Sequence, residues 1–494
     1  MNRFQTLAAA VTVTAAATAA AHDFGKVHHR PRLDFGQRIE AMLRQDSLAL
    51  FGFYAPLDDS STLSLSAAEA EANPARLLTV APGLHVRVLS AAANLAPNID
   101  QMFLYPAKHP THVIACNEQG SGQVAVQRVE IRSGKAENII SAGMTSCDPA
   151  RVTPWGTVIV GEENGTNGRV FEILDPLHTT NVSVPSSGFG ASSDPAHVAA
   201  RPALGQFSFE GIAILPNGVV YLTDENRPGG GGIGNPGGAI VKFIPASAWN
   251  GGAAIVSLDQ SPWTAGSLYG MRIGRNNGSS DVGQGNEYGR GSWVVIPGAA
   301  PVNLRAATSS LKLTAYYRPE DMSIDQEALA DGDVRFCGTN TGQEVPDTGA
   351  DGDNHWGEVY CVTDGTVAQA SAIAVTNGIN TSSVPEYHAL ALGTPDFAMP
   401  DNIDIQPGTG NLVVDEDGEG AIYPTPHNND VWDCLDDGDD ADTLSDGCVR
   451  VMSLNDLTAE PTGGFFDASG SHYYVSIQHN ITGHGVILDV YGWR

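Results

Sequence analysis

Acidic side chains recur at matching places in a phrase that this sequence repeats. The phrase has an acidic or polar entry, alternating apolar residues, a turn containing glycine, and a second run that ends in acids. Clear copies cover 210–225, 318–336, 399–415 and 461–476, and looser copies begin near Thr111 and Thr153. Carboxylates that a repeated unit brings together repel one another unless cations neutralise them. Oxygen ligands suit Ca²⁺, and a set that includes cysteine suits a softer metal such as iron.

The candidate metal ligands are the acids that open or close these phrases. They are Glu162, Glu163, Glu210, Glu320 and Asp401, with Asp224, Glu225 and Asn402 as additional candidates. Each acid alone is better explained as a turn cap or a local ion pair, and only the matched set points to a metal site. Arg318 precedes Glu320 by two residues, and an arginine beside a metal cluster can bind a phosphate through two parallel N–H groups.

The elements that must position these acids are short strands. The clearer copies are typical of two strands joined by a tight turn, such as Asn217-Gly218 or Ser469-Gly470. Six copies predict an all-β, six-bladed β-propeller with long loop insertions near 228–310 and 424–447. The first strand of each blade then faces a central channel, where the acids converge. Radial blades also explain how 79–494 can form one domain larger than a usual single core.

The N-terminal region predicts export. Residues 1–21 have a positive start at Arg3, an apolar stretch over 7–21 and small residues at its end, as in a secretory signal peptide. Residues 22–78 form a polar tail with a short helical segment, which we expect over 37–53, and a second short helix over 66–72. No later stretch has the length of a membrane span. We expect a secreted or periplasmic protein.

Composition excludes some partners. The 494 residues include 26 basic and 56 acidic side chains, a formal charge of −30. Nucleic-acid binding and docking on anionic membranes both need clusters of Lys and Arg, and none is evident. The acidic runs near 351–354 and 436–442 are expected to be solvated loops. The nucleophile elbow G-x-S-x-G, the zinc motif H-E-x-x-H and the P-loop are absent from the sequence.

Six cysteines fit an oxidising compartment. Cys337 and Cys361 each end a strand-like run and are candidate cross-strand neighbours, while Cys434 and Cys448 bracket an acidic loop. Cys116 and Cys147 remain. Six cysteines allow 15 pairings, so spacing alone leaves the connectivity open.

Several phrases together resemble the PhoX-type alkaline phosphatases. Thr153-Pro154-Trp155-Gly156-Thr157 followed by Glu162-Glu163-Asn164 is similar to their TPWGT…EEN signature. The other matching segments, which keep the family order, are Phe207–Gly211, Tyr221–Glu225, Arg318–Asp321, Pro400–Asn402, Pro461–Gly463 and Ile477–His479. The resemblance runs from about 147 to 480, which is most of the chain.

The resemblance implies a secreted phosphatase on a six-bladed propeller, with a mixed iron–calcium cluster. By position it implies that Glu162, Glu163, Glu210, Glu320 and Asp401 bind metal, that Arg318 binds phosphate, and that Cys147 is an iron ligand. The chain departs from the family where Ser146-Cys147-Asp148-Pro149 replaces a glycine-rich context and where Phe209 stands at a common histidine. Cys116 also offers Cys147 a disulfide partner, and a disulfide-bonded Cys147 cannot bind iron.

We therefore expect a monomeric metal-dependent phosphatase that acts on a small phosphorylated substrate. Two alternatives remain open. A calcium-dependent, lactonase-like hydrolase would also use a cage such as Glu210, Glu320, Asp401 and Asn402, although a neutral lactone has no need of Arg318. A non-catalytic secreted propeller stabilised by Ca²⁺ would bind metal without turnover.

Overall fold

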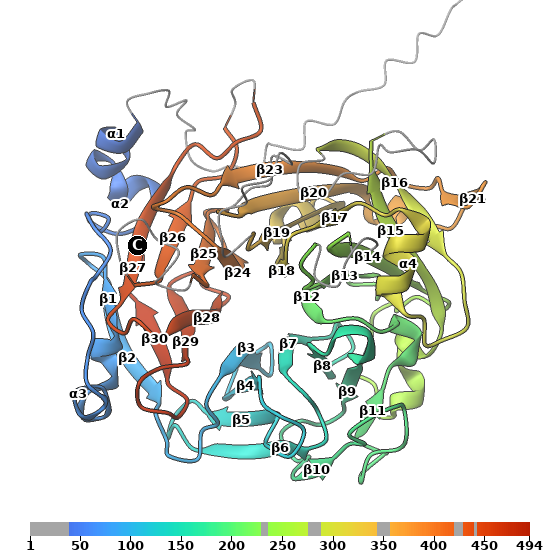
Figure 1. The fold of residues 1–494 in the computed structure, drawn as a ribbon, viewed down its shortest axis with the longest axis horizontal. Coiled ribbons are helices and arrows are strands. Elements are labelled where there is room, and N and C mark those ends of the chain that lie inside the picture. Colours follow the sequence, from blue (N-terminus) through green and yellow to red (C-terminus); the bar gives the residue numbers. More distant parts are fainter. Residues whose placement is uncertain (1–38, 229–235, 275–287, 343–355, 419–427, 439–441) are drawn as a thin grey trace, which may run out of the picture.

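Six short strands surround the central axis of the molecule (Figure 1). The structure is a computed structural model, and it describes residues 39–228, 236–274, 288–342, 356–418, 428–438 and 442–494. The six innermost strands are β3 (Ile99–Tyr105), β7 (Cys147–Val152), β12 (Phe209–Ile214), β18 (Pro319–Ile324), β24 (Pro400–Ile405) and β28 (Glu460–Phe466). Each packs beside the next, and β28 returns to β3. The six-bladed, all-β propeller predicted from the repeats is confirmed.

Each blade extends outward from its inner strand as an antiparallel meander, except that the outermost strand of the first blade, β10, pairs parallel with β6. The first two blades add β4 (His112–Asn117), β5 (Val126–Glu130), β6 (Ala136–Ala142) and β10 (Val182–Ser183), and then β8 (Val158–Glu162), β9 (Val170–Ile173) and β11 (Val198–Ala200). The third adds β13 (Val220–Asp224), β14 (Gly238–Pro245), β15 (Gly266–Ile273) and β16 (Gly289–Ile296). The fourth adds β19 (Asp333–Asn340), β20 (Glu358–Thr366) and β23 (Glu386–Leu392).

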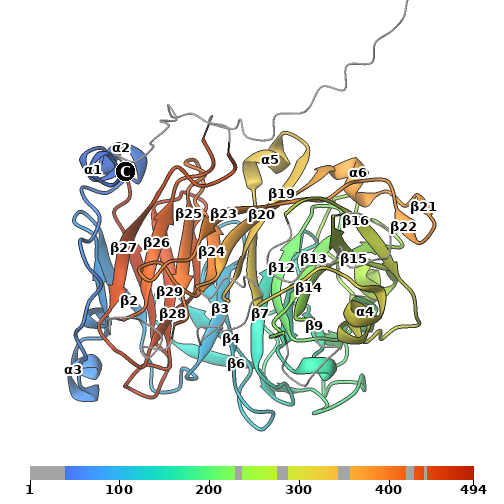
Figure 2. The ribbon, with the colours of Figure 1, turned by 45° about the horizontal axis from the view of Figure 1, so that its top comes forward.

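The N-terminal strands complete the last two blades and so close the ring. The fifth blade adds β25 (Leu412–Glu416), β26 (Asp430–Cys434), β27 (Cys448–Leu454) and β1 (Leu78–Val80), and the sixth adds β29 (His472–Gln478), β30 (Ile487–Tyr491) and β2 (His85–Ser90). The N-terminal strand β1 pairs with β27, and β2 pairs with β30. The fifth and sixth blades are therefore each built from strands of both the N-terminal and the C-terminal part of the chain. Figure 2 shows β2 beside the C-terminal blades.

Hydrogen bonds divide these strands into five sheets, since Gly289 and Arg290 of β16 pair with β23 and join the third and fourth blades. Three shorter strands lie outside this path: β17 (Ala315–Tyr316), β21 (Val375–Thr376) and β22 (Ile379–Asn380). Apolar side chains between adjacent blades form the core. Between the first two blades, for example, Ile114 and Val126 belong to one cluster with Val160 and Phe171.

The two long insertions expected from the sequence contain blade strands. The region 228–310 supplies β14, β15 and β16 of the third blade, together with α4 (Leu304–Leu311), and 424–447 contains β26. The long connections between these strands interrupt the alternating pattern, so the strands were not recognised from the sequence. Two further short helices, α5 (Gln326–Ala330) and α6 (Val367–Ser371), follow β18 and β20.

The single helix expected over 37–53 is wrong. The chain forms α1 (Ile39–Gln45) and α2 (Ser47–Leu50), because Asp46 between them has non-helical torsions of −103° and 14°. The second helix is confirmed as α3 (Ala67–Ala72), which begins with a capping box between Ser66 and Glu69. The signal peptide expected over 1–21 lies outside the described residues. Among the described residues, no helix is both long and apolar enough to cross a membrane.

Candidate metal centre

Every inner strand has a β-bulge at the same level of the channel. The pairing with the second strand of the blade skips two residues each time. The six skipped pairs are Asp100-Gln101, Asp148-Pro149, Glu210-Gly211, Glu320-Asp321, Asp401-Asn402 and Gly463-Gly464. A bulge redirects a side chain that regular pleating would place elsewhere. These six positions are therefore structurally equivalent.

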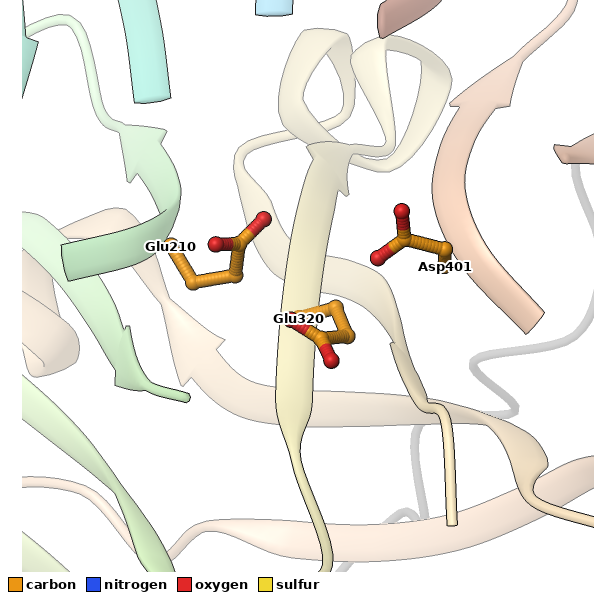
Figure 3. A group of neighbouring side chains, drawn as sticks. All are labelled: Glu210, Glu320 and Asp401. Atoms are coloured by element: carbon orange, nitrogen blue, oxygen red, sulfur yellow. The ribbon is translucent and has the colours of Figure 1, made fainter. Parts of the chain in front are cut away.

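The first residue of the bulge is acidic in five of the six blades. Asp100, Asp148, Glu210, Glu320 and Asp401 are all buried and line one cavity of about 810 Å³. Glu210, Glu320 and Asp401 each present a carboxylate oxygen within 4.8 Å of the other two. Figure 3 shows these three groups turned toward one another. A Ca²⁺ ion with bonds of about 2.3–2.6 Å spans such a triangle.

A second row of acids lines the same cavity. Glu118, Glu163, Glu225 and Asp417 each follow the final residue of a second blade strand, and Glu460 begins β28. Side chains alternate between faces along a strand, so the strand residue just before each of the first four acids points away from the cavity and does not line it. The row brings the number of acids that line the cavity to ten.

Glu162 immediately precedes Glu163, and its side chain points away from the cavity. Both of its carboxylate oxygens accept hydrogen bonds of 2.6 Å from Arg169, and the Thr145 amide donates to it at 3.0 Å. It is fully buried and does not line the cavity. The expectation that both Glu162 and Glu163 bind metal is therefore corrected for Glu162, because the alternation along the strand turns the two side chains to opposite faces.

Two additional candidates also have local partners. Asp224 accepts hydrogen bonds from Arg305 at 2.9 Å and from the Ser208 amide at 3.1 Å. The Asn402 oxygen accepts hydrogen bonds of 2.6 Å from the Thr462 hydroxyl and the Gly463 amide. Neither residue lines the cavity, whereas the third candidate, Glu225, does.

Burial and mutual repulsion raise the pKa of most of the cavity acids, whereas Glu225 and Asp417, which contact Arg318, have a lowered pKa. Burial, with the charge of Asp148 next, raises the pKa of Glu210 well above its ordinary value. Burial also raises the pKa of Asp401 well above its ordinary value, and the negative charge of Glu320 is the next largest cause. For Asp100, burial and the charge of Glu118 raise the pKa to about 7. Cations that replace the protons on these acids would relieve both penalties.

Arg318 lies among these acids. Its Nε contacts Glu225 at 2.7 Å and Glu320 at 2.9 Å, and one terminal nitrogen donates to Asp417 at 2.8 Å. The described residues offer the other terminal nitrogen, Nη1, no hydrogen bond. Although burial acts to lower it, these carboxylates raise the pKa of Arg318, so the guanidinium keeps its charge.

Comparison with protein families matches residues 121–480 to the family described as alkaline phosphatase PhoX. The chain belongs to the PhoX family. Among solved structures, Pseudomonas fluorescens PhoX in complex with vanadate, described as a transition state analogue, has a TM-score of 0.60 at 15% identity, over 88% of this chain and 98% of that one. This likeness shows the propeller fold.

Other solved structures are less similar. Virginiamycin B lyase from Staphylococcus aureus has a TM-score of 0.38 at 12% identity, over 83% of this chain and 99% of that one. The PQQ domain of pyranose dehydrogenase from Coprinopsis cinerea has a TM-score of 0.41 at 12% identity, over 84% and 97%. Among curated protein sequences, none matches this chain.

The structure removes Cys147 from the ligand set that the PhoX resemblance implies. Cys147 forms a disulfide with Cys116, so it has no thiolate to offer a metal. The pairs Cys337–Cys361 and Cys434–Cys448 are also present, which confirms both pairings expected from the sequence. The donor set of the cavity therefore fits Ca²⁺ and does not fit iron bound through cysteine.

Sequence reasoning missed five of the cavity acids. They are Asp100, Glu118, Asp148, Asp417 and Glu460. A usable signal existed for the bulge acids, because an acid, one intervening residue and an apolar residue recur in Asp100–Met102, Asp148–Ala150 and Glu210–Ile212. The looser copies of the phrase begin on the second strand or on the turn before it, one strand too late to include these acids.

Proposed function

We propose that this chain is an exported, calcium-dependent phosphatase that hydrolyses small phosphate monoesters at the cavity on the propeller axis. The observation that carries the proposal is the buried Arg318 among the ten acids that line the cavity in the described part of the chain. The three disulfides support export, since disulfides persist mainly in oxidising compartments. The proposal includes cleavage after residue 21 and a monomer that needs neither nucleic acid nor membrane.

The carboxylates are proposed to hold the cations. Glu210, Glu320 and Asp401 supply one triangle of oxygens, and the second row, Glu163 and Glu225 among it, supplies further ligands in the same cavity. When bound, Ca²⁺ would polarise the phosphoryl oxygens and offset their charge. Without bound cations, the negative charges of the cavity acids would repel a phosphate ester. Activity should therefore depend on the cations.

Arg318 is proposed to orient the phosphate. Its Nε and one terminal nitrogen are held by carboxylates, which fixes the plane of the guanidinium. The remaining Nη1 can then donate to a phosphoryl oxygen without reorganisation. A neutral lactone would gain nothing from this group, so the structure favours a phosphate ester over the lactone alternative.

The test is turnover of p-nitrophenyl phosphate by the full exported protein, first with Ca²⁺ and then after chelation with EGTA. Activity should need Ca²⁺, and Arg318→Ala should lower it by about 100-fold or more, as loss of one transition-state donor does elsewhere. Arg318→Lys should recover little, because lysine lacks the planar fork. Arg87→Ala is the matched control, since Arg87 pairs with Asp489 on the outer edge of the sixth blade.

Circular dichroism should show that each variant is folded. Calcium binding without turnover would favour the non-catalytic propeller, and hydrolysis of lactones alone would favour a lactonase. Either result would refute the proposed activity.

A further inference from the structure

Asp148 occupies the position in the second blade that acids occupy in four other blades. It is the first residue of the bulge in β7, equivalent to Glu210 in β12 and Glu320 in β18. Its side chain is 3% exposed and lines the cavity. The Oδ1 atom is buried and has no hydrogen-bond partner among the described residues. A buried carboxylate oxygen without a partner is costly, and a cation would supply the missing contact.

Cys147 faces the opposite way. It immediately precedes Asp148 in the same strand, and its partner Cys116 lies in β4 of the first blade. Both cysteines belong to the apolar cluster between these two blades, with Ile114 and Phe171. Opening the disulfide would therefore leave the thiol of Cys147 in the core, on the far side of the strand from the cavity.

The other donors around the cavity are also oxygens, with one exception. His479 lies at the mouth, where its side chain is 47% exposed and its Nε2 is 3.3 Å from the Glu460 carboxylate. No cysteine is among the described residues that line the cavity. Hard oxygen donors in a large, irregular set favour Ca²⁺, whereas thiolates and imidazoles select the transition metals.

We infer that this chain holds a cluster of Ca²⁺ through oxygen ligands alone, with Asp148 among them, and that it needs no iron. The inference rests on the calcium site of the proposed function. It departs from the iron–calcium cluster that the family resemblance implies.

The experiment measures metal content of the full exported protein, purified with both iron and Ca²⁺ present, by mass spectrometry and visible absorption. The wild-type protein should contain Ca²⁺, with iron far below one atom per chain and no visible band. Asp148→Cys, made together with Cys116→Ser and Cys147→Ser to prevent mispairing, should acquire iron and a thiolate-to-iron(III) charge-transfer band. Asp148→Ser in the same background is the matched control, because serine has the size of cysteine but no thiolate.

Three results would overturn the inference. One is stoichiometric iron in the wild-type protein. Another is iron gained by a fourth protein, the single variant Cys116→Ser, in which Cys147 is a free thiol; that result would make Cys147 the ligand. The third is an Asp148→Cys protein that binds no more iron than Asp148→Ser. Iron with phosphatase activity would overturn this inference alone, whereas Ca²⁺ without iron or turnover would support it and overturn the proposed activity.

Discussion

At the scale of single residues, the direction of a side chain decides its chemistry more than its type does. Glu162 and Glu163 are adjacent acids, yet Glu162 is bound to Arg169 in the core of the second blade and Glu163 lines the cavity. The same alternation separates Asp224 from Glu225. An acid is thus a candidate ligand here if it follows the last residue of the second strand, opens a bulge or, like Glu460, begins an inner strand.

Replacing Glu162 should lower stability, whereas replacing Glu163 should lower Ca²⁺ affinity. Glu162→Gln leaves Arg169, which is 1% exposed, without its charged partner, so the free energy of unfolding should fall by about 3–5 kcal/mol. Glu163→Gln removes one of the mutually repelling acids, so the calcium-free protein should unfold no more easily. Its Ca²⁺ affinity should fall by about tenfold or more, since changes even beyond the direct ligands have effects of that size.

Urea denaturation of the calcium-free proteins and calorimetric Ca²⁺ titration separate the two effects. A larger loss of Ca²⁺ affinity in Glu162→Gln than in Glu163→Gln would contradict this assignment.

The sequence predicts some of these residues because their copies of the phrase are clear. Glu210, Glu320 and Asp401 are recognisable as acids that open a phrase, and the structure brings their oxygens together. Asp148 was missed because a bulge adds a residue and so shifts the period-two pattern by one. The PhoX resemblance pointed instead to the neighbouring Cys147, whose side chain lies in the apolar cluster between the first two blades.

At the scale of elements, the bulge in five of the six inner strands places an acid in the cavity. The sixth blade has the bulge but no acid in it. Its bulge is Gly463-Gly464 where the other five blades begin with an acid. Gly463 has a φ of +60°, and a Cβ there would lie 2.1 Å from the backbone oxygen of Asp100. The ring of acids is open at this blade because no side chain fits.

Gly463→Ala should therefore be more destabilising than the same change at a glycine with open space. Gly408, in the turn between β24 and β25, has a φ of +82°, and a Cβ added there would have no neighbour within 4 Å. Gly408→Ala should cost about 1–2 kcal/mol from the left-handed backbone alone. Gly463→Ala should cost a further 1–3 kcal/mol or so from the clash. Chemical denaturation of both variants measures the difference in their free energies of unfolding. Equal losses would show that the backbone at Asp100 can shift to accommodate the added Cβ at little cost.

At the scale of the whole molecule, the repeats predicted the propeller but not how its ring closes. Six similar phrases imply six blades, since each blade needs neighbours to bury both faces. Closure depends on β1 and β2, which come from outside the repeats and pair with the last two blades. The outer strands of the third blade were also missed, because their long connections interrupt the spacing that identifies a hairpin.

The net charge of −30 also acquires a structural meaning at this scale, because ten of the 56 acids line one cavity. In calcium-free protein, burial raises the pKa of Asp100 to about 7 and that of Asp148 and Glu210 well above the ordinary value. The folded state then holds protons that the unfolded chain releases near pH 4. Stability should therefore fall as the pH rises from about 4 through 7, because the cavity acids whose pKa is raised outnumber Glu225 and Asp417, whose pKa is lowered.

Calcium should reverse this trend, because it binds the deprotonated carboxylates of the folded state. At a concentration 100 times its Kd, it should add about 2.7 kcal/mol to the free energy of unfolding, and the gain should grow between pH 5 and pH 8. Thermal unfolding of stripped and desalted protein, with and without Ca²⁺, tests both signs. NaCl at matched ionic strength controls for general screening, which weakens exposed charges far more than buried ones. A calcium-free protein whose Tm rises with pH over this range would show that the cavity acids are already neutralised within the chain, and the case for a cation cluster on the axis would fail with it.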